Sequence, residues 1–279
     1  MSYTTIYIVL FAALLHALWN AFIKAADDRL ATLGLISLGH VVLGGILASQ
    51  YPAPAPESWP FIAGSTIIHF GYYFLLYHSY RLGDLSHVYP IARGMSPVLV
   101  ALGAQVFAGE VLPPIAWGGI LLASFGIFML AGDLFRSATP PLVVLTALAT
   151  GTMIASYSLV DGMGVRVAGT ALGYIGWLFI AEIFTAGFIF ARMGGKMLQI
   201  SRRTLVFGLI GGLVSASAYG LVIYVKTIAP LGMVSTLRET SVVFATLIGM
   251  IWLKERPWKL RLVAAMVVVS GVILITFSA

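Results

Sequence analysis

The sequence predicts an all-α, polytopic membrane protein with about ten transmembrane helices, arranged as two inverted five-helix repeats around a central cavity. Three observations predict this fold. The composition is 60% hydrophobic and only 9% charged, with a mean hydropathy of +1.00, which excludes an ordinary soluble domain. The apolar residues fall into long runs with short connectors between them. The stretch 81–129 also recurs without a gap at 226–274.

The apolar runs have the length of membrane-spanning helices, because a bilayer core requires about 20 apolar residues per helix. None of the connectors between these runs is long enough to hold a soluble domain. We expect helices near residues 4–24, 31–49, 59–80, 86–107, 114–132, 141–160, 169–191, 204–225, 231–252 and 259–278.

The repeat follows from one constant offset, 255 − 110 = 145, which carries Glu110 onto Glu255. Other residues matched by this offset are Arg81 with Lys226, Arg93 with Arg238, Ser96 with Ser241, Leu102 with Leu247, and Gly126 with Gly271. A match at one fixed period predicts a duplication, and paired halves are typical of transporters. We divide the chain into a first repeat, 1–137, and a second, 138–279. Because five helices is an odd number, the second repeat would enter the membrane from the opposite side.

The Lys and Arg residues of the loops are unevenly distributed. With loops counted in chain order, all loop cations except Arg166 and Lys226 lie in odd-numbered loops. Short cytoplasmic loops are enriched in Lys and Arg, so this distribution predicts that both termini lie outside. The net charge of +6 is then expected to meet lipid headgroups rather than nucleic acid.

Short motifs occupy equivalent places in the two halves. Trp19-Asn20 with Lys24 closes the first expected helix, and Gly109-Glu110-Val111-Leu112 follows the fourth and precedes a Gly-rich helix. Leu253-Lys254-Glu255-Arg256 stands at the matching place in the second half. With these motifs the chain resembles the drug/metabolite transporter superfamily, specifically its EamA-like family, over nearly its whole length. The string from His16 to Asn20 is also similar to a subgroup associated with phosphonate utilisation.

The resemblance implies secondary transport of small polar metabolites by alternating access, with export more common than import and no nucleotide involved. It implies a multi-pass protein of the cell membrane, the bacterial inner membrane, whose partners are a small-molecule substrate and the lipid bilayer. No cofactor, nucleic-acid partner or enzymatic reaction is expected, and both a monomer and a homodimer stay open. Such proteins usually have both ends in the cytoplasm, so the resemblance and the loop charges disagree on orientation.

Arg93 and Arg238 are the first candidates for substrate binding, because each lies well inside an expected helix. An arginine at the centre of a membrane helix costs about 2.5 to 3.5 kcal/mol, so it must face water or a partner. One interpretation is a pair of cations that attracts an anionic group of an amino acid, carboxylate or phosphonate. The alternative is a structural ion pair, for which Glu239 or Glu182 could supply the carboxylate.

Glu182 and Glu239 are the acids that we place well inside helices. If the substrate moves with a proton, one of them should carry it, because a desolvated carboxyl binds a proton more readily than one in water. The alternative is that they neutralise the arginines. For Glu239, which is adjacent to Arg238, we favour this alternative.

Polar residues at helical spacing on the first helix predict one wall of the cavity. His16, Asn20 and Lys24 follow at intervals of four residues, so they share one face. A polar face cannot turn toward lipid without cost. His16, Trp19 and Asn20 are therefore expected to contact the substrate, whereas Lys24 is expected to extend to the interface.

Tyrosines predict further parts of the wall. Tyr73 and Tyr77 share a face of the third helix with His69 and Tyr80. An interfacial aromatic belt is the alternative, but these two tyrosines lie too far inside the helix for that. Tyr157 extends the predicted wall into the second half.

Pro90 and Pro97 bracket Arg93 in the fourth helix. A proline removes one backbone hydrogen bond and bends the helix, so gating is one interpretation and local packing is the other. The matching positions in the second half are Ser235 and Val242. The two halves therefore need not bend alike.

The sequence lacks the motifs of several other classes of protein. It contains no Cys, no Walker A motif, no His-Glu-x-x-His, no Gly-x-Ser-x-Gly and no clustered metal ligands. We therefore expect neither an ATP-driven pump nor a metalloprotease, and no metal site. Two alternatives to metabolite transport stay open. One is a multidrug or cation exporter, whose substrates two arginines would repel, and the other is a non-transporting intramembrane enzyme or scaffold.

Overall fold

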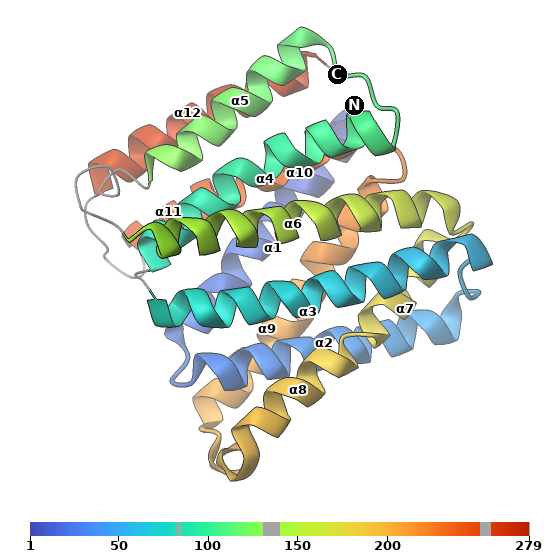
Figure 1. The fold of residues 1–279 in the computed structure, drawn as a ribbon, viewed down its shortest axis with the longest axis vertical. Coiled ribbons are helices and arrows are strands. Elements are labelled where there is room, and N and C mark those ends of the chain that lie inside the picture. The colour runs from blue at the N-terminus through green and yellow to red at the C-terminus, as the bar shows by residue number, and fades with distance from the viewer. Residues whose placement is uncertain (83–84, 131–139, 252–257, 279) are drawn as a thin grey trace.

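The computed structural model is built of helices (Figure 1). It describes residues 1–82, 85–130, 140–251 and 258–278, the side chains of 76–82, 85–89, 198 and 258 excepted. No β-strand occurs within these ranges. The predicted all-α class is confirmed.

The order of elements follows the predicted runs. The first part of the chain contains α1 (Tyr3–Ala25), α2 (Arg29–Gln50), the short 3-10 helix η1 (Pro56–Ser58), α3 (Trp59–Leu82), α4 (Leu85–Phe107) and α5 (Pro114–Met129). The second part contains α6 (Pro141–Val167), α7 (Ala171–Ile180), α8 (Ile183–Met193), the 3-10 helix η3 (Gly194–Gln199), α9 (Arg202–Val225), α10 (Leu231–Arg238), α11 (Ser241–Ile251) and α12 (Trp258–Phe277).

The first two helices begin at residues that cap their free backbone N–H groups. The hydroxyl of Ser2 accepts a hydrogen bond from the N–H of Thr5 at 3.2 Å. The carboxylate of Asp28 accepts from the N–H groups of Leu30 and Ala31 at 2.9 and 3.0 Å. Side-chain caps of this kind stabilise helix starts by about 1 kcal/mol each. The cap at Asp28 helps α2 to begin shortly after α1 ends at Ala25.

Within the described part of the chain, eight helical segments are long and apolar enough to cross a membrane, when α7 with α8 and α10 with α11 are each taken as one segment. α5 is apolar but shorter. Large apolar side chains such as Tyr7, Phe11 and Phe184 are exposed on the outside of the bundle. An exposed apolar surface of this extent suits contact with lipid. The architecture agrees with the predicted multi-pass membrane protein.

The helices pack in a few long pairs, several of them between the two parts of the chain. α5 lies along α12, α2 along α9, α1 along α9, and both α3 and α4 along α6. Glycines permit the closest approaches: a Cβ at Gly119 would lie 2.6 Å from the carbonyl of Gly271, and one at Gly39 would lie 2.6 Å from Cα of Gly212. Small residues of this kind let membrane helices pack backbone to backbone.

Three predicted helices differ from the structure. α6 extends to Val167 rather than ending near 160. The seventh and ninth predicted helices are divided, with α7 giving way to α8 near Glu182 and α10 giving way to α11 near Glu239. At these breaks the backbone bonds reach back only three residues, from Glu182 to Phe179 at 3.1 Å and from Glu239 to Thr236 at 3.0 Å. Tight turns inside a helix often mark functional hinges.

The two ends of the chain lie close together at one end of the bundle (Figure 1). Met1 packs against the apolar clusters that contain Ala229 and Leu112, so the connectors that follow α4 and α9 are at this same end. The predicted boundary between repeats, at 137 and 138, lies outside the described residues.

Candidate site: a shared carboxylate between two arginines

Arg93, Arg238 and Glu239 meet in one buried cluster between α4 and α10. Nε of Arg93 lies 2.9 Å from Oε2 of Glu239, and Nη2 of Arg238 lies 3.5 Å from Oε1 of the same carboxylate. Nη2 of Arg93 also donates to Oγ of Ser241 at 3.1 Å. At most 5% of each charged side chain is exposed. One carboxylate therefore serves two guanidinium groups, which leaves the cluster with an excess of positive charge.

The local structure of α4 and α10 presents these groups to each other. α4 contains both Pro90 and Pro97 and still continues as one helix past Arg93. α10 ends at Arg238, and Glu239 is its C-terminal cap residue. The free carbonyl groups at a helix C-terminus favour a cation there. The break between α10 and α11 therefore both ends the helix and holds the charged pair.

The hydrogen bond from Arg93 to Ser241 has no counterpart in the other half. The offset of 145 makes Arg238 and Ser96 the equivalent residues. Nε of Arg238 and Oγ of Ser96 are both buried, and neither has a hydrogen-bond partner among the described residues. A buried polar atom without a partner costs about 1 to 3 kcal/mol. Ser241 thus has a guanidinium partner, whereas the equivalent hydroxyl of Ser96 has no hydrogen-bond partner among the described residues.

Of the predicted wall residues of α1, Trp19 and Asn20 bond to His16, which lies near the cluster. Nε1 of Trp19 donates to Nδ1 of His16 at 3.3 Å, and Nδ2 of Asn20 donates to the backbone carbonyl of His16 at 2.7 Å. His16 lies within electrostatic range of both arginines. Lys24 is exposed in the last turn of the helix, where it was expected to reach the interface.

Tyr157 of α6 stands in an aromatic cluster beside the arginines. Its ring stacks on that of His69, with centroids 4.1 Å apart, and meets the rings of Tyr72 and Tyr219 edge-on at 5.9 and 6.0 Å. Tyr73 joins the same cluster through Tyr72, at 5.3 Å. Tyr157 also lies within electrostatic range of both arginines and their carboxylate. The structure therefore brings together parts of α1, α3, α4, α6 and α10.

Glu182 stands outside the arginine cluster, and the side chain of Tyr77 is not described. Glu182, at the break between α7 and α8, accepts a hydrogen bond from Oγ of Ser37 at 3.3 Å. The side chain of Tyr77 lies outside the described residues. Among the described residues, no group of three or more His, Asp or Glu side chains is arranged to hold a metal ion.

A second buried polar network lies on α6, and the sequence analysis missed it. Asp161 accepts hydrogen bonds from the hydroxyl groups of Tyr174, at 3.3 Å, and Tyr219. One turn earlier, Ser158 accepts two hydrogen bonds from Nζ of Lys226, at 2.6 Å to its carbonyl and 2.7 Å to its hydroxyl. Asp161 and Lys226 are both completely buried.

This network corrects two interpretations. The acids inside helices are not limited to Glu182 and Glu239, because α6 extends past the predicted end and encloses Asp161. Lys226 does not reach lipid headgroups, because it follows α9 directly and its side chain turns inward against α6. One signal was available in the sequence: Asp161 follows Tyr157 by four residues, which places both on one face of the helix.

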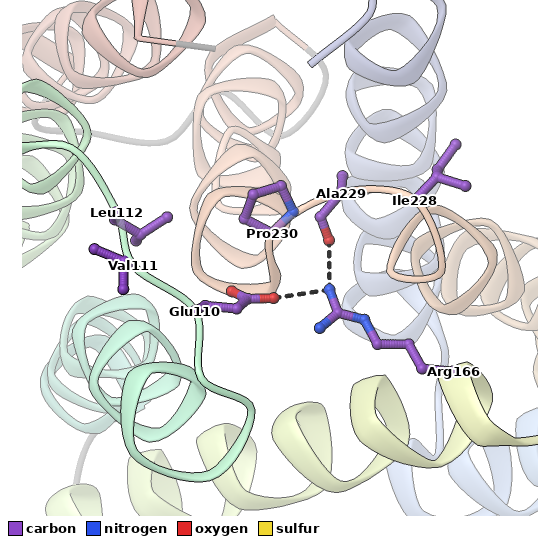
Figure 2. Close-up of a pocket in the computed structure, with 7 residues that line it drawn as sticks. All are labelled: Glu110, Val111, Leu112, Arg166, Ile228, Ala229 and Pro230. Carbon is purple, nitrogen blue, oxygen red and sulfur yellow. Dashed lines mark hydrogen bonds and ion pairs between the residues drawn. The ribbon is translucent and has the colours of Figure 1, made fainter.

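Glu110 and Arg166 tie three segments together at the end of the bundle that carries the termini (Figure 2). Nη2 of Arg166 lies 2.7 Å from Oε1 of Glu110. Arg166 also donates to the carbonyls of Lys226 and Ala229, at 2.8 and 2.9 Å. The Glu110 carboxylate accepts from the N–H of Leu231 at 2.9 Å, at the start of α10, where the helix dipole favours an anion.

The motif Gly109-Glu110 thus has a structural role. Gly109 has a φ of 65°, a backbone conformation that favours glycine, and it turns the chain so that Glu110 points at α10. A hollow of about 300 Å³ lies beside the ion pair with Arg166, lined also by Val111, Leu112, Ile228, Ala229 and Pro230.

No protein-family model matches the sequence. No curated protein matches it either. A solved structure described as "Crystal structure of protein" superposes on the chain with a TM-score of 0.77 and 20% sequence identity, and 99% of each chain is covered. At that level of identity the likeness shows the fold, which is therefore shared over the whole length by a protein of known structure.

Proposed function

We propose that the protein is a secondary transporter that moves small anionic or zwitterionic metabolites by alternating access. The observation that carries the proposal is the buried cluster in which Arg93 and Arg238 share the single carboxylate of Glu239. The resemblance to the EamA-like family supports the same class of protein. It also favours the bacterial inner membrane as the location and export as the direction.

The cluster suits a substrate that carries a carboxylate or phosphonate. Such a group would neutralise the excess positive charge and could accept a hydrogen bond from Nε of Arg238, which has no partner among the described residues. Guanidinium groups bind planar carboxylates and phosphate-like oxygens through paired, charge-assisted hydrogen bonds. His16 and Tyr157 lie within electrostatic range of the arginines, and we propose that they contact the remainder of the substrate. Trp19, Asn20 and Tyr73 are proposed to form the next layer of the wall.

Two inverted repeats, 1–137 and 138–279, are part of this proposal. Helix packing supports them, because α1 lies along α9 as α6 lies along α3, and α5 lies along α12. If each helix is replaced by its equivalent in the other half, the pair α1–α9 becomes the pair α6–α3, and the pair α5–α12 becomes itself. Repeats related in this way can alternate between two packings around a fixed site.

The Ser96 hydroxyl, which has no partner among the described residues, supports the proposal of two alternating states. In the structure, Nη2 of Arg93 donates to Ser241, whereas Nη2 of Arg238 lies 3.5 Å from Oε1 of Glu239 and the hydroxyl of Ser96 has no partner among the described residues. We propose that the opposite state forms the bond from Arg238 to Ser96 and releases Ser241. The breaks at Glu182 and Glu239, together with Pro90 and Pro97 in α4, are the places where the helices would bend.

Substrate exchange in proteoliposomes tests the proposal. Purified protein should accelerate the exchange of at least one of three labelled probes, L-serine, succinate or 2-aminoethylphosphonate, and Arg238→Gln should abolish that exchange. Arg203→Gln is the matched control, because the side chain of Arg203 is 58% exposed and pairs with Asp27 at the surface. If no probe moves and Arg238→Gln alters thermal stability alone, a non-transporting scaffold becomes the better interpretation.

A thermal-shift comparison separates metabolite transport from cation export. Two cavity arginines repel cations, so succinate or 2-aminoethylphosphonate should stabilise the protein and tetraphenylphosphonium should not. Stabilisation by tetraphenylphosphonium alone would favour a multidrug exporter.

A further inference from the structure

Asp161 and Lys226 are two buried charged residues that do not form an ion pair. Both are completely buried, yet neither lies within 4.0 Å of an oppositely charged group among the described residues. Neutral groups solvate them instead: two tyrosine hydroxyls for Asp161, and the hydroxyl and carbonyl of Ser158 for Lys226. Burial without an opposite charge in contact disfavours the charged form of a lysine side chain.

The surroundings of Lys226 favour release of its proton near neutral pH. Lys226 follows the membrane-spanning segment that ends at Val225, and burial, followed by the charge of Arg238 on α10, lowers its pKa to about 7. The other charged groups in range are Asp161 and Arg166 on α6 and Glu110 in the connector after α4. An ordinary lysine has a pKa of about 10.4.

Ser158 and Arg166 connect Lys226 to α10 on one side and to the hollow at the end of the bundle on the other. Oγ of Ser158 lies 3.3 Å from Oγ of Ser235 on α10, one turn before Arg238. On the other side, the carbonyl of Lys226 accepts from Nε of Arg166, which lines the hollow at the end of the bundle (Figure 2). Lys226 is therefore connected to α10 through Ser158, and to the hollow through Arg166.

The tyrosines extend the network toward the aromatic cluster. Tyr219, which donates to Asp161, meets the rings of Tyr157 and His69 edge-on, at 6.0 and 5.9 Å. His69 of α3 stacks on Tyr157, and Tyr157 lies within electrostatic range of Asp161. A change in the charge of Asp161 or Lys226 would therefore alter the electrostatic potential at the wall of the proposed site.

We propose that Asp161 and Lys226 form the proton-binding site that couples transport to a proton gradient. This inference rests on the proposed function. In one step, the Lys226 amine takes a proton from water to become an ammonium group held by Ser158 and balanced by Asp161. In the reverse step, the ammonium returns the proton to water, and the bond to Ser158 weakens, which allows α10 to move without bound substrate; the protonated protein moves only with substrate bound. No bond between heavy atoms forms or breaks.

Proteoliposomes separate coupling from transport itself. Exchange of the probe between equal pools on both sides needs no proton gradient, whereas accumulation against a concentration difference does. With whichever of L-serine, succinate or 2-aminoethylphosphonate the wild type exchanges, an imposed pH gradient should drive accumulation. Asp161→Asn and Lys226→Arg should keep exchange and lose gradient-driven accumulation. Lys226→Arg keeps the positive charge and can donate to Ser158 but does not titrate, so it distinguishes proton release from a structural role.

The controls are two exposed residues of the same types, Asp27→Asn and Lys196→Arg, which should keep both activities. The inference is overturned if the wild type exchanges the probe without gradient-driven accumulation, or if Lys226→Arg and Asp161→Asn still accumulate it. An absence of exchange in the wild type would instead overturn the proposed function, and the coupling with it.

Discussion

Nε of Arg93 and Oε2 of Glu239 lie 2.9 Å apart and join α4 to the break between α10 and α11. The pair connects two segments that are far apart in the sequence and on opposite sides of the predicted repeat boundary. The same carboxylate also contacts Arg238, so it holds both arginines in this cluster. The charged centre and the hinge in α10–α11 are therefore the same place.

Removing that carboxylate should destabilise the protein strongly. Glu239→Gln leaves two buried guanidinium groups without the anion that they share, and breaking a buried pair costs about 3 to 5 kcal/mol. The thermal midpoint in detergent should fall well below that of Glu57→Gln, a control at an exposed position. Equal midpoints for the two variants would show that the pair contributes little to stability.

Ser96 and Ser241 should have opposite effects on the balance between two states. Ser241→Ala removes a hydrogen bond that this structure contains, and Ser96→Ala removes one proposed only for the opposite state. Because the chain has no Cys, a single Ser235→Cys can report on access by maleimide labelling. Ser241→Ala should raise the labelling rate of this buried position and Ser96→Ala should lower it. Changes in the same direction would contradict the exchange of partners.

Adjacent glycines in α5 should respond differently to alanine. At Gly119 a Cβ would lie 2.6 Å from the carbonyl of Gly271, whereas at Gly118 it would meet nothing within 4 Å. We expect Gly119→Ala to destabilise by about 1 to 3 kcal/mol through overpacking. Gly118→Ala should gain up to about 1 kcal/mol of helix propensity. Thermal unfolding in detergent compares them, and equal midpoints would contradict tight packing of α5 on α12.

Stability should rise with pH because of Lys226. Burial lowers its pKa to about 7, so between that value and about 10.4 the unfolded chain holds a proton that the folded protein does not. The free energy of unfolding should increase by about 1.4 kcal/mol per pH unit in this window and should not change from this cause below it. Lys226→Met should flatten the rise in thermal midpoint between about pH 7.5 and about pH 9. Lys196→Met, at an exposed site, should leave it unchanged. A wild type without the rise would contradict the assignment.

The contacts of two loop cations increase the charge asymmetry between the two sides, on which the prediction that both termini lie outside depends. The two cations that the loop count assigned to the terminal side, Arg166 and Lys226, are held by Glu110 and Ser158 rather than facing headgroups. On the opposite side, Arg202 and Arg203 are exposed. A cysteine added after Ala279 should react with a membrane-impermeant maleimide on intact cells. Reaction only after permeabilisation would favour the arrangement that the family resemblance implies.

The sequence predicted the helices well because membrane spans depend on a single strong requirement, an apolar length that matches the bilayer. It also singled out Arg93, Arg238 and Glu239, since charges inside apolar runs are costly and stand out. The pairing with Glu239 was one of two alternatives for the arginines. The contacts show that the ion pair exists, and its proposed role in binding a substrate stays a prediction.

The sequence could not locate the breaks in helices or the network on α6. No proline or glycine marks the turn at Glu239, where the bend depends on the contacts of α10 with α4 and α6. Asp161 and Lys226 each lie at the edge of an apolar run, so hydropathy assigned them to connectors. Their burial results from the long C-terminal extension of α6 and from the inward turn of a lysine, and both depend on tertiary packing.

The glycine-lined contact between α5 and α12 has a consequence for how the chain is made. α5 ends at Met129, and its partner does not begin until Trp258. During synthesis the glycine face of α5 therefore contacts lipid or an insertion factor until α12 has been made. A chain truncated before α12 would keep this face uncovered.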